Sequence, residues 1–341
     1  MKTNQSITRR EFIRRSACGA GLAAVGGGLL AASGEEARKQ ANPLTYDLER
    51  FSKTDPKLVQ YEEASRFTCP GPDPRRLALG AGDRCYVAGR NGISVLNRLG
   101  EPQGEIPMSA PARCVAAAGD GTVFAGARDH IEVFSPKGAR QAAWESPGGR
   151  TWLTGLTVDE GEIYAAAAGN RVVLRYARAG KLLGRIGEKD RERSIPGLIV
   201  PSPYLDVKLG QDGLLRMNNP GRHRVEVYTV KGDLEFSWGR PSAAIDGFCG
   251  CCNPVSLALL PDGRCVTCEK GLPRAKVYSV QGEFESVVAG PESFPQNAKA
   301  GALNDKSDGL LGGLDAAVDE QGRIFLLDVV TGEVRVFRRK A

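Results

Sequence analysis

The sequence predicts an all-β chain folded as a six-bladed β-propeller, and three observations lead to this fold class. The first is composition: 43 glycines against three tryptophans and three methionines indicate many tight turns and favour β structure. The second is an internal repeat with strand-like apolar alternation. The third is that the last repeat is one strand short, while an isolated strand-like segment precedes the first repeat.

Six segments of the chain share one pattern. Each has an apolar run, a tight Asp/Gly turn, a second apolar run, a polar turn and a third alternating run, as in CVAAAGDGTVFAGARDHIEVFSPKGA from Cys114. In five of the segments a further glycine turn opens a fourth strand. Four antiparallel strands repeated at about 40 to 45 residues are typical of a propeller blade. The segments begin at residues 77, 114, 156, 205, 257 and 315.

The sixth segment ends after its third strand, so its blade needs a strand from elsewhere. The stretch KLVQYEEASRF, residues 57–67, has strand character and no neighbouring partner. We expect it to supply the missing outer strand and to close the ring. The propeller is therefore predicted to span residues 57–341, as a single six-bladed domain.

Two stretches carry a resemblance to a known repeat. NPGRHRVEVY, residues 219–228, and TGEVRVF, residues 331–337, resemble NHL repeats, and the similarity extends over about residues 57–341. The resemblance implies an NHL-type propeller, in which His223 occupies a common structural position. It does not imply one function, because NHL-type propellers include ligand-binding domains, lyases and lactonases.

The N-terminus has the features of an export signal. Residues 8–14 read TRREFIR, and an apolar Ala/Gly/Leu run follows over 17–32. The block resembles a bacterial twin-arginine (Tat) signal, with Arg9 and Arg10 as the pair and Phe12 after it. We therefore expect a signal peptide over residues 1–33 and a polar linker over 34–56. The resemblance implies export by the Tat translocase to the periplasm or beyond, and a membrane anchor only if the signal is not cleaved.

The charge distribution argues against a nucleic-acid partner. The formal net charge is +6, but the first fifteen residues hold five basic side chains and one acidic side chain, which is +4. The rest of the chain carries only about +2 by the same counting. After cleavage no stable membrane span is expected, so the predicted partner is a small molecule or a protein. The N-terminal charges are Lys2, Arg9, Arg10, Arg14, Arg15 and Glu11.

Long loops are predicted to gather on one face of the propeller. The turns between the first and second strands and between the third and fourth strands are short. The connections that lead into new blades include residues 186–204, 239–254 and 289–313. Loops longer than about 12 to 15 residues are usually functional or disordered. We call this side the loop-rich face and expect the functional site there.

Eight cysteines lie outside the signal, and repeat alignment divides them. Cys85 and Cys265 begin equivalent second strands, and Cys114 replaces a first-strand leucine, so these three are expected to be small buried hydrophobic residues. The other five are expected to form a cysteine cluster on the loop-rich face. They are Cys249, Cys251, Cys252, Cys268 and Cys69.

Three interpretations of this cluster remain open from the sequence. A disulfide such as Cys249 with Cys268 would contribute roughly 3 kcal/mol by chain entropy, and adjacent Cys251 and Cys252 could form a vicinal disulfide. Alternatively, the thiolates could bind a metal or an iron–sulfur cluster. The third interpretation is free or packed thiols. Lys270 and Arg274 flank the cluster and are expected to form a solvated rim.

The leading functional prediction is an exported binding or scaffold module with a redox-active or metal-linked cysteine cluster. The alternative is a divalent-metal-dependent hydrolase or lyase, lactonase-like, acting at the channel mouth. Such propellers hold calcium or another divalent ion with Glu, Asn and Asp side chains, whereas only two histidines, His130 and His223, are present for zinc. The candidate ligands at blade tops are Asp129, Asn170, Asn218, Asn219, Asp246, Glu269 and Asp328.

Overall fold

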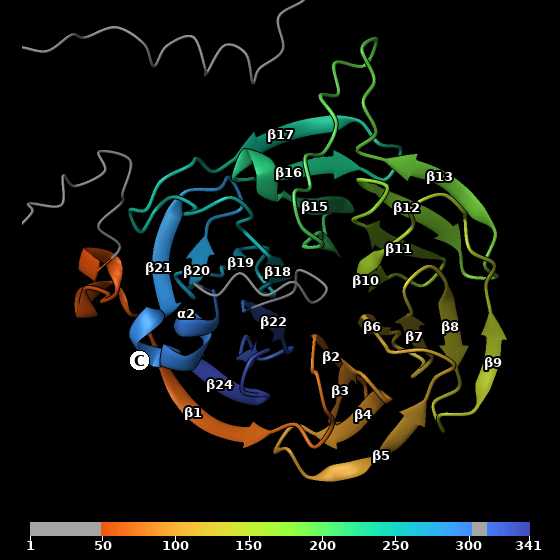
Figure 1. Cartoon of the computed structure of the whole chain (residues 1–341), viewed down its shortest axis with the longest axis horizontal. Helices are drawn as coiled ribbons and strands as arrows, with labels where there is room; N and C mark the ends of the chain where they lie inside the picture. Colours follow the sequence, from red (N-terminus) through yellow and green to blue (C-terminus); the bar gives the residue numbers. More distant parts are fainter. Residues whose placement is uncertain (1–48, 302–311) are drawn as a thin grey trace, which may run out of the picture. The chain divides into compact units, whose positions relative to one another are not determined.

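The computed structural model describes residues 49–301 and 312–341, which belong to one compact unit, Asp47–Ala341. Its strands form six four-stranded antiparallel sheets. Figure 1 shows these sheets arranged around a common centre, with β2, β6, β10, β18 and β22 among the innermost strands. The prediction of an all-β six-bladed propeller is confirmed. The export signal expected over residues 1–33 lies outside the described residues, so it stays a prediction.

Blades 1 to 5 are each built from four consecutive strands, in the order innermost to outermost. Blade 1 contains β2 (Arg76–Gly80), β3 (Arg84–Gly89), β4 (Gly92–Asn97) and β5 (Pro102–Pro107). Blade 2 contains β6 (Cys114–Ala117), β7 (Val123–Gly126), β8 (Ile131–Phe134) and β9 (Arg140–Ala143). Blade 3 contains β10 (Leu153–Val158), β11 (Glu162–Ala167), β12 (Val172–Ala177) and β13 (Leu182–Ile186). Blade 4 contains β14 (Val207–Leu209), β15 (Leu214–Asn219), β16 (Arg224–Thr229) and β17 (Leu234–Trp238). Blade 5 contains β18 (Ser256–Leu259), β19 (Cys265–Cys268), β20 (Ala275–Tyr278) and β21 (Phe284–Ala289).

Blade 6 joins the two ends of the described chain. It contains β22 (Leu314–Val318), β23 (Ile324–Asp328) and β24 (Glu333–Arg339), and β1 (Tyr61–Thr68) pairs antiparallel with β24 as the outer strand. The predicted ring closure by an N-terminal strand is therefore confirmed. Tyr61 lies opposite Arg339 and Thr68 lies opposite Glu333.

The described helices are short and lie before β1 or in connections between strands. They are the 3-10 turns η1 (Glu49–Phe51), η2 (Pro56–Leu58), η3 (Pro220–Arg222) and η4 (Pro291–Ser293), and the α-helix α2 (Pro295–Gly301). Within the described ranges, no helix is long and apolar enough to cross a membrane. The long connections fall where the sequence places them, after β13, β17 and β21.

The hydrophobic core is divided among the six contacts between neighbouring blades. Each apolar cluster draws side chains from two adjacent sheets, because each sheet packs on both faces. Gly282 illustrates the fit: its backbone φ is +90°, and a Cβ there would lie 2.0 Å from the Trp238 ring of the preceding blade. Only glycine allows this turn to lie against Trp238.

Candidate functional site

A buried arginine crosses the centre of the propeller. Arg76 begins β2, and its guanidinium donates to the carbonyl oxygen of Thr154 (2.8 Å), the carbonyl oxygen of Val255 (3.2 Å) and Asp315 Oδ1 (2.6 Å). Asp206 Oδ2 lies 3.5 Å from its Nη1. One side chain from blade 1 thus contacts blades 3, 4, 5 and 6, which is possible only where six inner strands converge.

Two buried carboxylates compensate this arginine and join the inner strands. Asp315 Oδ2 accepts from the Leu77 backbone N–H (2.7 Å), and Asp206 Oδ2 accepts from the Leu257 backbone N–H (2.9 Å). Lys208 Nζ donates to Asp206 at 3.0 Å. Burial alone would raise the pKa of Asp206, but Lys208 and Arg76 more than offset it and hold the pKa below its usual range. The central channel is therefore crossed by a network of paired charges.

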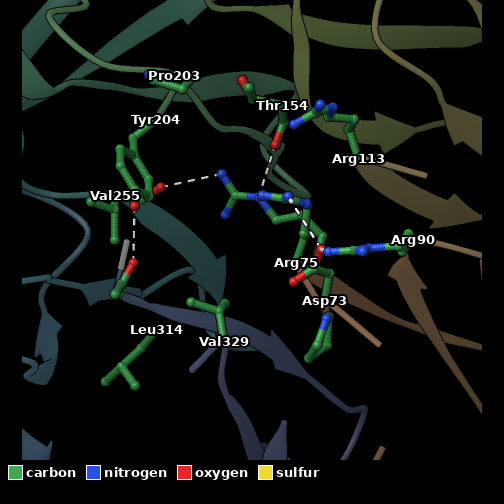
Figure 2. A pocket seen from close by; sticks show the side chains of 14 residues that line it. Asp73, Arg75, Arg90, Arg113, Thr154, Pro203, Tyr204, Val255, Leu314 and Val329 are labelled. Atoms are coloured by element: carbon green, nitrogen blue, oxygen red, sulfur yellow. Dashed lines mark hydrogen bonds and ion pairs between the residues drawn. The ribbon is translucent and has the colours of Figure 1, made fainter. Parts of the chain in front are cut away.

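A pocket of about 250 Å³ lies beside this network, and Arg76 is one of its lining residues. Four arginines and one aspartate line it, so its charged side chains are predominantly positive. Figure 2 shows Arg90 and Arg113 across the pocket from Tyr204. We call this cavity the arginine pocket. Its lining comprises Asp73, Pro74, Arg75, Arg76, Arg90, Arg113, Thr154, Pro203, Tyr204, Val255, Gly312, Gly313, Leu314 and Val329.

Neighbouring groups hold the arginine side chains at the pocket. Arg90 Nε donates to Asp73 Oδ2 at 2.9 Å, and Arg75 Nη2 lies 4.0 Å from the same oxygen. The guanidinium of Arg113 lies 5.0 Å from the ring centroid of Trp152, which Arg128 also contacts at 4.9 Å. Such cation–π contacts orient a guanidinium without neutralising its charge.

Tyr204 forms part of the pocket wall. Its hydroxyl donates to the Gly312 carbonyl oxygen at 2.9 Å, and Lys270 Nζ lies 4.4 Å from its ring centroid. Burial raises the pKa of Tyr204, so the phenol stays protonated at neutral pH. This wall is therefore an uncharged hydrogen-bonding surface.

The five cysteines expected to cluster are distributed over three places. Cys69 packs with Cys85 between blades 6 and 1, and Cys268 packs in the apolar cluster between blades 5 and 6. Cys249, Cys251 and Cys252 lie together in the connection before β18. The burial expected for Cys85, Cys114 and Cys265 is confirmed.

Among the described residues no Cys249–Cys268 disulfide and no metal-ligand group is found, whereas Cys251 and Cys252 are adjacent free thiols. All eight described cysteines are free, and no three His, Cys, Asp or Glu side chains there are placed to hold a metal ion. Cys69 and Cys268 lie in different apolar clusters, and burial there raises the pKa of Cys69 to about 12 and that of Cys268 well above its usual value. Metal binding needs the thiolate form, which this burial disfavours.

The cysteine loop, residues 248–254, is anchored at both ends. The Cys249 backbone N–H donates to Glu269 Oε2 at 3.1 Å. The Asn253 side-chain amide donates to the carbonyl oxygens of Cys249 (2.6 Å) and Lys270 (2.9 Å). Arg274, expected at a solvated rim, is instead buried and donates to Glu269 (2.8 Å), because this carboxylate needs a cation in the interior.

None of the seven candidate divalent-metal ligands lines the arginine pocket. Three of the four buried candidates form hydrogen bonds elsewhere: Asn218 Nδ2 donates to the Pro254 carbonyl oxygen, Asn219 Nδ2 donates to Glu226, and Asp328 accepts from Asn297. The amide nitrogen of Asn170 lies near Gly149. Of the other three, Asp129 contacts the His130 ring, Asp246 pairs with Arg240, and the buried Glu269 pairs with Lys276.

Sequence reasoning missed the arginine pocket. Arg75 directly precedes the inner strand of blade 1 and Arg76 begins it, and Arg113 directly precedes the inner strand of blade 2. The available signal is this shared position, because a residue just before an inner strand lies at the channel mouth on the loop-rich face. Tyr204 gave no such signal, since it belongs to a long connection.

Comparison with known proteins supports the architecture but does not assign the chain to a family. No protein-family model and no curated protein matches the sequence. A solved streptogramin B lyase structure is similar at a TM-score of 0.55 and 15% identity, covering 82% of this chain and 97% of the other. Virginiamycin B lyase from Staphylococcus aureus is similar at a TM-score of 0.55 and 16% identity, covering 82% and 100%. At these identities the similarity is one of fold: the chain is a six-bladed β-propeller built like these lyases.

Proposed function

We propose that this protein is a binding module whose arginine pocket takes a small anionic ligand carrying carboxylate or phosphate groups. The observation that carries the proposal is the lining of the pocket, where four arginines face a single aspartate. Guanidinium groups bind planar carboxylates and phosphates through paired N–H donors. A cavity of about 250 Å³ suits a small ligand rather than a polymer.

The arginines differ in what they can offer a ligand. Arg76 already donates to acceptors on several blades, and Asp315 and Asp206 balance its charge, so it lines the pocket without being a proposed ligand contact. Arg90 and Asp73 form an exposed ion pair, with side-chain exposures of 65% and 43%. Such pairs contribute little net stability, so an anion can compete with Asp73 for Arg90. Arg75 and Arg113 complete the proposed contact set.

The proposal is tested by calorimetric titration of the protein with citrate and with inorganic phosphate at low ionic strength. Arg75→Gln and Arg113→Gln should each weaken binding at least about tenfold, because each removes charge-assisted hydrogen bonds. Arg128→Gln is the matched control: Arg128 contacts the same Trp152 ring as Arg113 but does not line the pocket. Its affinity should stay close to that of the unmodified protein.

Two results would count against the proposal. One is the absence of measurable binding of either anion to the unmodified protein. The other is an equal loss of affinity in Arg75→Gln, Arg113→Gln and Arg128→Gln, which would indicate general surface electrostatics. The lyase alternative has weaker support, because none of its candidate ligands lines the pocket.

A further inference from the structure

The cysteine loop brings two adjacent thiols into contact. Cys251 Sγ and Cys252 Sγ are 3.0 Å apart. Cys251 is exposed, whereas Cys252 is 3% exposed. The pair therefore consists of one thiol that solution reagents can reach and one that they cannot. Neither residue lines the arginine pocket, so this feature is independent of the proposed anion site.

The backbone on both sides of the pair is held in place. Asn253 is buried, and its side-chain amide donates to the carbonyl oxygens of Cys249 (2.6 Å) and Lys270 (2.9 Å). The Lys270 backbone N–H donates back to Asn253 Oδ1 at 2.9 Å. Because these bonds close the loop around the two cysteines, their sulfur atoms stay within reach of each other. A thiol pair that is positioned in advance loses little conformational entropy on joining.

Two polar groups beside Cys252 partly offset the effect of its burial, although its pKa stays above the usual value. Burial raises the pKa of Cys252, as does the hydrogen bond with Cys251, whereas the Ser202 hydroxyl and the Lys270 ammonium lower it. A cation and a hydroxyl beside a buried sulfur stabilise a thiolate when one forms. Burial is the largest influence on the pKa of Cys85 as well and raises it to about 12, but among the described residues no exposed cysteine lies beside Cys85.

We infer that Cys251 and Cys252 form a dithiol that is oxidised by low-molecular-weight disulfides through thiol–disulfide exchange. The Cys251 thiolate attacks one sulfur of the disulfide RSSR, forming a mixed disulfide and releasing one RSH after protonation. The Cys252 thiolate then attacks Cys251 Sγ, forming the Cys251–Cys252 disulfide and releasing the second RSH. The two cysteines are oxidised by two electrons, and RSSR is reduced to two RSH. Lys270 favours an anionic disulfide.

The test uses the reduced full chain, oxidised glutathione as the probe, and intact-mass and peptide analysis after alkylation. The unmodified protein should lose two alkylatable thiols, both in the cysteine loop, and should retain no glutathione adduct. Cys252→Ser should stop at a glutathione adduct on Cys251, because the resolving thiol is absent. Cys251→Ser should keep its Cys252 thiol unreacted over the same time, because Cys252 is buried.

Cys249→Ser is the matched control, since Cys249 is a half-buried thiol of the same loop. It should lose two thiols as the unmodified protein does. A stable adduct on the unmodified protein would overturn the inference, as would thiol loss that depends on Cys249 or an unreactive Cys251. Circular dichroism of each variant separates a loss of exchange from a loss of folding.

Discussion

The chain uses most of its cysteines as small apolar side chains. Five of the eight described cysteines are buried in contacts between blades, where burial raises the pKa of the thiol. A thiol that stays protonated packs like a small hydrocarbon and needs no strong hydrogen-bond partner. This use separates them from Cys251, the exposed thiol. The five are Cys69, Cys85, Cys114, Cys265 and Cys268.

Buried thiols should make the protein less stable at alkaline pH, and Cys85→Ala tests this at one residue. The pKa of the Cys85 thiol is about 9 in the unfolded chain and about 12 in the folded protein. Below pH 9 the thiol is protonated in both states. Between pH 9 and pH 12 only the unfolded state releases the proton, so the free energy of unfolding falls as the pH rises. Each such thiol contributes a decline of about 1.4 kcal/mol per pH unit.

Urea unfolding under reducing conditions at pH 8 and at pH 10 to 11 measures that decline. Cys85→Ala should cost about 1 kcal/mol at pH 8 but should show a shallower alkaline decline than the unmodified protein. Val87→Ala, a truncation in the same apolar cluster, should lower stability without changing the slope. An unchanged slope in Cys85→Ala would show that its thiol titrates alike in both states.

At the scale of elements, strands β19 and β20 anchor the loop that carries the thiol pair. Glu269 and Arg274 lie in the turn between β19 and β20, Lys276 lies in β20, and all three are buried and contact residues 239–254. Arg274 Nη1 donates to the Ala243 carbonyl oxygen (3.0 Å), and Lys276 Nζ donates to that of Gly247 (2.6 Å). Burial lowers the pKa of Lys276 to about 8, although Glu269 opposes the shift. The conformation of the loop thus depends on two buried cations, Arg274 and Lys276, whose charges are both balanced by the carboxylate of Glu269.

Glu269→Gln should therefore destabilise the protein by about 3 kcal/mol or more, because it leaves Arg274 and Lys276 buried without a counter-charge. Asp246→Asn in the same loop is the control: its partner Arg240 is 61% exposed, and breaking exposed pairs costs less than about 1 kcal/mol. Denaturant unfolding measures both values, and amide exchange over residues 243–249 reports loop opening. Equal effects of the two substitutions would contradict the role of Glu269.

At the scale of the whole molecule, the repeats predict the architecture well because most blades are formed by strands that are consecutive in the sequence. The blade number, the closing strand and the loop-rich face all follow from counting strands and turns. The site does not follow in this way. Arg76 meets Asp315 only because the ring closes, and 239 positions separate the two residues in the chain. Arg274 was expected at a solvated rim beside the cysteines, and the sequence did not show that it would be buried with Glu269.

Ring closure by β1 gives the final prediction. Deleting residues 1–68 removes β1 and leaves β24 as an unpaired edge with the apolar side chains of blade 6 uncovered. We expect this chain to unfold without cooperativity or to aggregate.

In the ring, the Lys340 backbone N–H donates to the Gln60 carbonyl oxygen at 3.0 Å, so the ends of β24 and β1 are adjacent. Residues 60–68 joined after Lys340 by an Asn-Gly turn should therefore restore blade 6 as a continuous four-stranded sheet. Chromatographic size and the cooperativity of urea unfolding compare the two chains. A truncated chain that unfolds as cooperatively as the complete one would show that the ring does not depend on β1.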